Sequence, residues 1–109
     1  MIFGGMRSMW ILVMFDLPVD TPEAKAAYRE FHDFLLDEGY LMLQYSVYAR
    51  PCASEEVLDV HESRAEKRLP DDGQVRILKF TDSQYARMKT FYGKIRGPTE
   101  KAPDQLTFL

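Results

Sequence analysis

The sequence is short of cysteine and of long apolar runs, and each shortage narrows what the chain can be. Its 109 residues contain one cysteine, Cys52, which excludes a disulfide framework and a zinc site built from cysteines. A lone cysteine is typical of a reducing compartment, so we expect a cytoplasmic location. No apolar stretch approaches the roughly 20 residues that a membrane helix needs, and no membrane partner is expected.

A strong excess of charge of either sign is also missing. The chain has 14 basic and 17 acidic residues, which gives a formal net charge of −3. No overall field therefore attracts it to nucleic acid, and any binding to phosphate must come from a local patch. The length suits one domain, for which roughly 100–150 residues is usual, and dimerisation would help a core of this size.

Several catalytic and nucleotide-binding motifs are absent as well. No serine or cysteine elbow supports nucleophilic hydrolysis, and Gly4-Gly5 is a bare pair rather than a phosphate-binding loop. The glycine- and aromatic-rich run of RNA-recognition domains is missing too. The two imidazoles, His32 and His61, fall within predicted helices, where packing is a commoner role than ligation.

The most informative stretch runs from Trp10 to Pro18. Six apolar residues, rich in β-branched and aromatic side chains, precede Asp16, and a run this short predicts a strand buried on both faces. Pro18 cannot donate to a β-ladder and disfavours a helical conformation at Leu17, so the strand should end near Asp16. One carboxylate is thus placed where a core strand passes into a loop, and we expect Asp16 to lie near the functional site.

Helix and strand signals alternate along the middle of the chain. Thr21 is a suitable N-cap for a helix that Gly39 ends. Tyr40–Arg50 has the composition of one strand, or of two short strands that turn near residues 44–46. Ser54 opens a second helix, and five residues are expected to share its apolar side. They are Val57, Leu58, His61, Ala65 and Leu69.

The C-terminal third predicts a strand, a short helix and a tail. Residues 74–80 alternate as a strand, and Thr81 opens a helix in capping-box spacing that continues through Tyr92. Residues 94–103 are polar with two prolines and are predicted to be a linker. The last five residues alternate as a strand, which we expect to pair at a distance, as on a partner's sheet edge.

The order strand–helix–strand–strand–helix–strand predicts an α+β, ferredoxin-like fold, in which an antiparallel sheet has both helices on one face. Residues 1–8 are interpreted as a flexible leader and residues 9–93 as the ferredoxin-like domain. Residues 94–109 are interpreted as the linker and the C-terminal strand. Fold alone does not give function, so the functional hypothesis rests on individual residues.

Two roles are open to Asp16 on composition and spacing. A strand-end aspartate commonly caps the turn that follows it, here at Leu17-Pro18. A carboxylate in this position can also hold Mg²⁺, although a single one is too few for a tight site. Two copies related by a two-fold axis would supply a pair, and the metal would then stabilise charge during phosphodiester cleavage.

Local basic patches are the candidates for contact with nucleic acid. Arg64, Lys67 and Arg68 lie on the second predicted helix, and Arg50 ends the second strand region beside the sheet edge. There Arg50 could meet a phosphate or pair with a carboxylate. A solvated face balanced by nearby glutamates is the competing interpretation for the helix residues. Three more basic residues lie near the third helix: Lys89, Lys94 and Arg96.

Three segments taken together resemble a known family. They are Trp10–Pro18, the stretch from Gly39-Tyr40 through Met42-Leu43-Gln44-Tyr45-Ser46-Val47-Tyr48 to Arg50, and Thr81-Asp82-Ser83-Gln84 followed by Phe91-Tyr92-Gly93. In this order they resemble the small CRISPR-associated adaptation protein, also called the CRISPR-associated endoribonuclease. The pattern is most similar to the form found beside single-effector (type II) systems.

The resemblance implies a ferredoxin-like homodimer whose sheets face each other across a two-fold axis. The C-terminal strand, which contains Leu106 and Phe108, would join the partner's sheet. The family's catalytic, metal-binding aspartate matches Asp16, and two copies would hold Mg²⁺ between them. The implied activity is metal-dependent cleavage of RNA or double-stranded DNA. The implied role is spacer acquisition, in which the dimer bridges the adaptation integrase and holds the prespacer DNA.

Two alternatives accompany this interpretation. The first is a scaffold without catalysis, which would lie along the prespacer through Arg50 and the basic residues of the helices. The second is a toxin-like RNase of the same fold.

Overall fold

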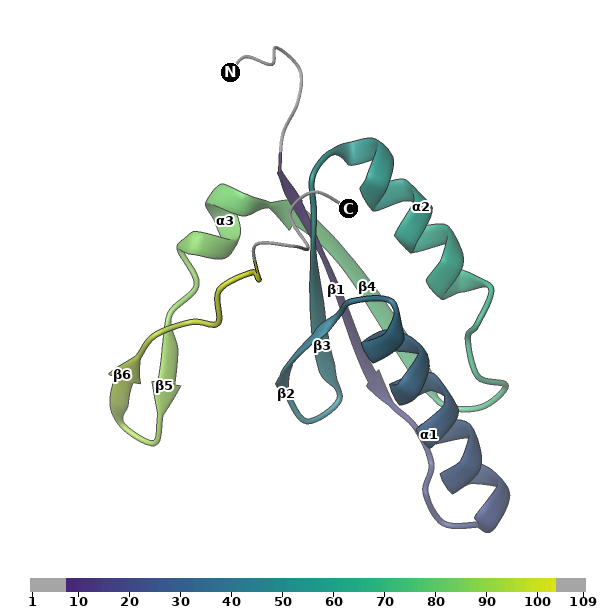
Figure 1. Cartoon of the computed structure of the whole chain (residues 1–109). Coiled ribbons are helices and arrows are strands. Elements are labelled where there is room, and N and C mark those ends of the chain that lie inside the picture. Colours follow the sequence, from purple (N-terminus) through teal and green to yellow (C-terminus); the bar gives the residue numbers. More distant parts are fainter. Residues whose placement is uncertain (1–7, 104–109) are drawn as a thin grey trace.

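The computed structural model describes residues 8–103, which form a four-stranded antiparallel sheet, two long helices and a separate hairpin (Figure 1). The sheet has the strand order β2-β3-β1-β4, and helices α1 and α2 pack on one of its faces. The predicted α+β, ferredoxin-like arrangement is confirmed. The bounds are β1 Met9–Asp16, α1 Pro22–Asp37, β2 Leu41–Gln44, β3 Val47–Cys52, α2 Glu55–Glu66, β4 Gln74–Thr81, α3 Asp82–Ala86, β5 Thr90–Tyr92 and β6 Ile95–Gly97.

Strand β1 holds the sheet together because it pairs with β3 on one side and with β4 on the other. Its side chains alternate between the two faces of the sheet. Ile11 and Val13 are completely buried beneath the helices, where they join Phe31 and Leu35 of α1 in the main core. The strand ends at Asp16 as the sequence predicts, and all of its apolar residues except the half-buried Met14 are buried.

Polar side chains fix where the helices begin. The Thr21 hydroxyl accepts a hydrogen bond from the backbone N–H of Ala24 at 3.0 Å, and the Ser54 hydroxyl accepts one from Val57 at 3.3 Å. These bonds satisfy donors that the first turn of a helix leaves unpaired. Gly39 follows α1 with a φ of +93°, as expected of a glycine that ends a helix. Within residues 8–103, no helix combines the length and apolar character that crossing a membrane requires.

Residues 41–52 form two strands, which resolves the alternative that the sequence leaves open. Strands β2 and β3 are joined by a turn at Tyr45-Ser46, and Ser46 has a φ of +63°. This left-handed conformation costs a non-glycine residue about 1–2 kcal/mol. The Ser46 carbonyl accepts the N–H of Phe15 at 3.1 Å, so the turn is joined to the end of β1.

The predicted helix through Tyr92 and the linker that follows it are wrong in part. Helix α3 ends at Ala86, and residues 90–97 form the β5–β6 hairpin. The sequence Thr90-Phe91-Tyr92 favours a strand over a helix. Gly93, with a φ of +66°, occupies the first position of the two-residue loop, where a type II′ turn requires glycine.

Leu69 lies beyond the end of α2 and is 44% exposed, so its assignment to the apolar side of that helix was wrong. The C-terminal strand with Leu106 and Phe108 lies outside the described residues, as does most of the leader. Ser8 is described, and its carbonyl accepts the N–H of Asp82 at 3.0 Å.

The buried hydroxyl of Tyr48 provides a test of the core. The Tyr48 ring is fully buried against Phe15, with 5.6 Å between the ring centroids, and its hydroxyl finds no hydrogen-bond partner within residues 8–103. Removing an unpaired buried hydroxyl relieves a desolvation cost. We therefore expect Tyr48→Phe to preserve the free energy of unfolding or to raise it by about 1 kcal/mol.

Tyr85 is the matched control for this substitution, because its hydroxyl donates to the carbonyl of Glu100 at 2.6 Å. Tyr85→Phe should lower the free energy of unfolding by about 1 kcal/mol. Urea denaturation measures both variants. A loss at Tyr48→Phe equal to that at Tyr85→Phe would contradict the packing described for the core.

Candidate functional site

Asp16 ends β1 on the face of the sheet that α1 and α2 leave uncovered. Phe15 lies in the main core beneath the helices, so alternation along the strand places its neighbour Asp16 on the opposite face. The same rule places Trp10 and Leu12 on that face. The Asp16 side chain is exposed, whereas the apolar residues before it are mostly buried. A charged group therefore stands at the rim of an apolar surface.

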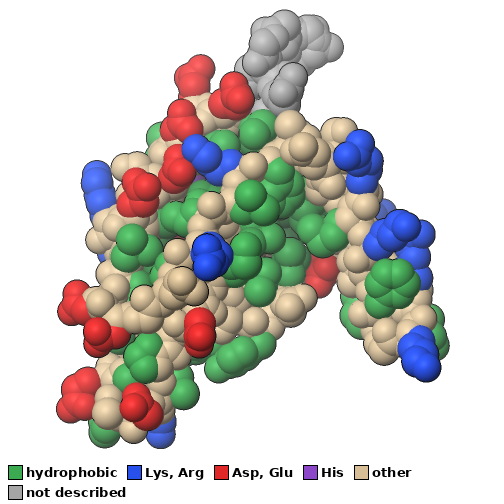
Figure 2. All heavy atoms as spheres, turned by 180° about the vertical axis from the view of Figure 1, so that it is seen from behind, with side chains coloured by type: hydrophobic (Ala, Val, Ile, Leu, Met, Phe, Trp, Pro, Cys, Tyr) green, Lys and Arg blue, Asp and Glu red, His purple; other side chains and the backbone are tan. Residues whose placement is uncertain are grey.

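The uncovered face has one protected end and one open end. Near α3, Trp10 stacks on Tyr85 with 3.7 Å between ring centroids and donates its indole N–H to Asp82 at 2.8 Å. Toward Asp16 the face is open, and Leu78 of β4 is 51% exposed. Figure 2 shows hydrophobic side chains gathered over the middle of this face. An exposed apolar area of this kind marks a contact surface.

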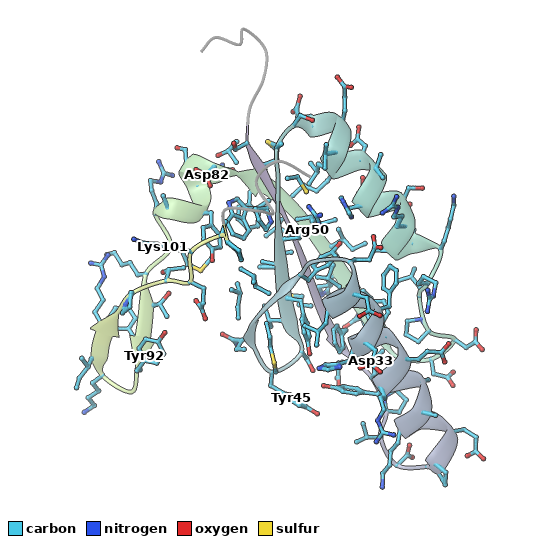
Figure 3. All side chains as sticks on the ribbon, viewed as in Figure 1. Asp33, Tyr45, Arg50, Asp82, Tyr92 and Lys101 are labelled. Carbon is cyan, nitrogen blue, oxygen red and sulfur yellow. The ribbon has the colours of Figure 1, made fainter. Side chains whose placement is uncertain are left out.

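The β2–β3 turn adds an aromatic side chain beside the end of β1. Tyr45 is 70% exposed at the tip of this turn (Figure 3), and its ring stacks on Tyr28 of α1 with 6.0 Å between centroids. The Tyr28 hydroxyl lies 3.4 Å from the hydroxyl of Ser46. Sequence reasoning did not select Tyr45 as a site residue. The one local feature that could have indicated a site is its position in the turn near residues 44–46, and the sequence did not establish that this turn exists.

The loop before β4 packs against the backbone of Asp16. Gly73 has a φ of +93°, and a Cβ built there would lie 2.7 Å from the carbonyl oxygen of Asp16. A hollow next to this loop is lined by Asp20, Asp71 and Asp72, so this end of the molecule is acidic. Within residues 8–103, no three histidine, cysteine or acidic side chains are grouped so that they could hold a metal ion. A single chain thus offers Asp16 as a lone exposed ligand.

Arg50 does not occupy the surface position that the sequence suggested. It is 2% exposed on β3 (Figure 3), where its Nε donates to the carbonyl of Glu38 and its Nη1 to that of Pro51, both at 2.7 Å. The guanidinium therefore satisfies the carbonyl end of α1, which favours positive charge. Its assignment as a contact for nucleic acid is corrected to a structural role.

The basic residues of α2 and its C-terminal end do not form one free patch. Arg64 pairs with the carboxylate of Glu38 at 3.3 Å, and the guanidinium of Arg68 stacks over Phe34 at 4.7 Å from the ring centroid. Lys67 is exposed. Two of these three cations therefore already have partners within the chain, and such exposed interactions contribute about 1 kcal/mol or less.

Neither histidine joins Asp16 in a catalytic pair. His61 is buried on α2, and burial together with the charge of Arg50 lowers the pKa of its imidazole despite the opposing effect of Glu38. Its Nδ1 lies 3.2 Å from the Glu38 carboxylate, which only accepts, so the neutral ring donates this bond. His32 contacts its neighbour Asp33 at 3.0 Å. Burial raises the pKa of the Cys52 thiol, as suits a packing residue.

Comparison with protein families identifies the family of this chain. Residues 9–88, which include the whole sheet and both long helices, match the family described as CRISPR associated protein Cas2. The chain belongs to the Cas2 family. The resemblance inferred from its three sequence segments is thereby confirmed.

Relatives and a solved structure agree with this assignment. A protein of Parvibaculum lavamentivorans named CRISPR-associated endoribonuclease Cas2 is 50% identical over 98 residues, which cover 90% of this chain and 97% of that protein. A protein of Paracidovorax avenae with the same name is 48% identical over 101 residues, 93% of this chain and 94% of that one. A solved structure described as "Crystal structure of cas2" matches with a TM-score of 0.56 at 22% identity, covering 86% of this chain and 97% of its own, and supports the fold.

The close approach of Gly73 to the end of β1 gives a prediction for stability. Alanine there would have a left-handed φ and a Cβ 2.6 Å from Leu17 Cδ2 as well as 2.7 Å from the Asp16 carbonyl. We expect Gly73→Ala to lower the free energy of unfolding by about 3 kcal/mol, from backbone strain and from overpacking. Thermal unfolding should show a decrease in Tm of more than 10 °C, at about 4–8 °C per kcal/mol.

Gly93→Ala separates the two causes, because Gly93 also has a positive φ. Within residues 8–103, no heavy atom beyond Gly93 and its two chain neighbours lies within 4 Å of the position that a Cβ would take there. This control should lower the free energy of unfolding by only about 1–2 kcal/mol, the cost of a left-handed φ in a residue other than glycine. Equal losses at the two glycines would show that the loop is not packed against Asp16 as described.

Proposed function

We propose that this Cas2-family chain acts in CRISPR spacer acquisition as a homodimer that binds nucleic acid, bridges the adaptation integrase and cleaves phosphodiesters with Mg²⁺. The observation that carries the catalytic part is the position of Asp16. Its carboxylate is exposed at the end of the central strand, on the sheet face that the helices leave open. Cleavage of RNA is supported by the name endoribonuclease, which the relatives from Parvibaculum lavamentivorans and Paracidovorax avenae carry. The resemblance adds double-stranded DNA as a second substrate.

The open sheet face supplies the reason to expect a dimer. Leu78 is half exposed there, next to the buried Leu12 of β1. Sheets that expose one apolar face commonly bury it against a second sheet, and a two-fold axis makes a single patch complementary to itself. Because Asp16 lies on the same face, such a dimer brings the two Asp16 carboxylates toward its axis.

The donor chemistry of this paired arrangement fits Mg²⁺. This ion prefers oxygen ligands, retains several waters and is commonly bound by one or two protein carboxylates. One Asp16 from each protomer would hold it, and when bound it supplies charge stabilisation to the phosphodiester. Tyr45, exposed beside the end of β1, offers a ring on which a nucleotide base can stack. In this role Tyr45 positions the substrate.

One observation favours a scaffold without catalysis as the second candidate. Asp16 stands without a cluster of further ligands in residues 8–103, so its metal site depends entirely on the geometry of the dimer. A dimer that aligns its two sheets differently would keep its binding surfaces but lose the carboxylate pair. The bridging role would then remain, and co-elution with the cognate integrase in gel filtration would test it.

Cleavage by purified wild-type and Asp16→Ala protein tests the catalytic proposal. Structured RNA and double-stranded DNA should each be tested across a pH series, with Mg²⁺ and with EDTA. We expect cleavage to require Mg²⁺ and to fall by about 100-fold or more in Asp16→Ala, because even indirect disturbance of a metal site costs 10–100-fold.

Asp20→Ala is the matched control, since Asp20 is an exposed carboxylate at the same end of the molecule. It should retain wild-type cleavage and the same dependence on Mg²⁺. Cleavage that survives Asp16→Ala would rule out the paired carboxylates as the catalytic site. A folded dimer that cleaves neither substrate at any pH would favour the scaffold.

A further inference from the structure

The β5–β6 hairpin and the residues that flank it, 87–101, concentrate positive charge in a protein that is acidic overall. Residues 87–101 contain five basic residues and one acidic residue, a formal charge of +4, so the remainder of the chain carries −7 of the total of −3. The hairpin extends away from the sheet, on the side opposite α1 and α2 (Figure 1). Figure 2 shows blue side chains gathered at this edge and red ones at the other. The five basic residues are Arg87, Lys89, Lys94, Arg96 and Lys101.

These five cations have no acidic partner within the described part of the chain. All five are exposed, and none forms an ion pair with any residue in the range 8–103. By contrast, Arg50 is buried and donates a hydrogen bond to the carbonyl of Glu38, Arg64 pairs with Glu38, and Lys79 pairs with Glu62. Charge that is not neutralised within the protein remains available to an anionic partner.

Aromatic side chains stand among the hairpin cations. Phe91 pairs across the strands with Arg96, so the two side chains share one face of the hairpin, and the Phe91 ring is 55% exposed. Tyr92 lies on the other face, where its ring covers Gly97 and its hydroxyl donates to the carbonyl of Pro98 at 3.2 Å (Figure 3). An exposed ring beside a guanidinium suits a nucleotide, which offers both a base to stack and a phosphate to bind.

Hydrogen bonds close the base of the hairpin, and one of them joins it to the body of the protein. The hydroxyls of Thr90 and Thr99 are 2.6 Å apart, and Thr99 also donates to the carbonyl of Met88 at 3.3 Å. The hydroxyl of Tyr85, in the second core, donates to the carbonyl of Glu100. The charges are therefore carried on a fixed element rather than on a free tail, which limits the entropy lost when they bind.

We infer that the β5–β6 hairpin is a binding surface for the phosphate backbone of nucleic acid, with Phe91 stacking on bases where the strand is single. This inference rests on the proposed role in nucleic-acid binding and assigns that role to a surface distinct from the Asp16 end. The separation follows from charge, because the acidic Asp20, Asp71 and Asp72 near Asp16 repel phosphate in the absence of metal. An acidic protein would also match the charge, but exposed aromatic side chains among the cations favour nucleic acid.

Salt-dependent binding of the full chain tests this surface. Binding is measured by fluorescence anisotropy with a double-stranded DNA and a single-stranded RNA of mixed sequence. EDTA in the buffer removes metal ions, so that only metal-independent binding is observed. Lys94→Gln with Arg96→Gln should weaken binding of both probes by at least about tenfold at low salt and reduce the slope of log K against log salt by about 2 per protomer. Phe91→Ala should weaken binding of the RNA by about fivefold or more and leave the DNA unchanged.

Two matched variants control for net charge and for folding. Lys25→Gln with Arg29→Gln removes the same charges from α1, where both residues are exposed, and should bind as wild type does. Lys94→Arg with Arg96→Lys keeps the hairpin charge and should restore binding. Equal losses from α1 and from the hairpin would overturn the assignment, because net charge alone would then explain binding.

Gel filtration and Asp16→Ala keep this inference separate from the proposed catalysis. Asp16→Ala should bind both probes in EDTA as wild type does, even if the protein proves to have no nuclease activity. The hairpin variant should keep the oligomeric state of the wild type. If it instead loses its oligomeric state while a nucleic acid still binds, the hairpin is a protein-contact surface and the inference is wrong.

Discussion

The pairing of β1 with both β3 and β4 is the constraint on which the rest of the structure depends. It fixes the alternation of side chains along β1, and this alternation divides the molecule into a face covered by helices and an open face. A shift of register by one residue would turn Phe15 out of the core and bury Asp16 in its place. Burying an unpaired carboxylate is costly, so the apolar pattern that stabilises the fold also keeps the candidate ligand at the surface.

Much of this arrangement could be predicted from the sequence because its signals are local. The apolar run before Asp16, the caps Thr21 and Ser54, and Gly39 after α1 each act within a few residues, and the structure has each where expected. The hairpin was missed because Met88, Phe91 and Tyr92 have the spacing of a helix stripe. The β-propensity of Thr90–Tyr92 and the turn at Gly93 prevailed over that spacing.

Residue roles that depend on contacts distant in sequence were harder to predict. Arg50 ends a strand region, which suggested an exposed cation, but the carbonyl end of α1 lies above it and takes its hydrogen bonds. Arg64 and Arg68 likewise find Glu38 and Phe34. No sequence pattern marks such partners. The result is a molecule with an acidic end at Asp16 and a basic hairpin, two surfaces on which different parts of one substrate can be held.

The proposed function depends above all on two Asp16 side chains that meet at the axis of a dimer, and proximity cross-linking tests this most directly. The single native cysteine is 1% exposed and will react little, so Asp16→Cys introduces one accessible thiol per chain. With the dimer verified by gel filtration, a short bis-maleimide should link Asp16→Cys into covalent dimers, whereas Glu55→Cys, exposed on α2, should remain unlinked. A dimer in which Asp16→Cys is not linked more than Glu55→Cys would contradict the proposal, because the open sheet faces would not meet at Asp16.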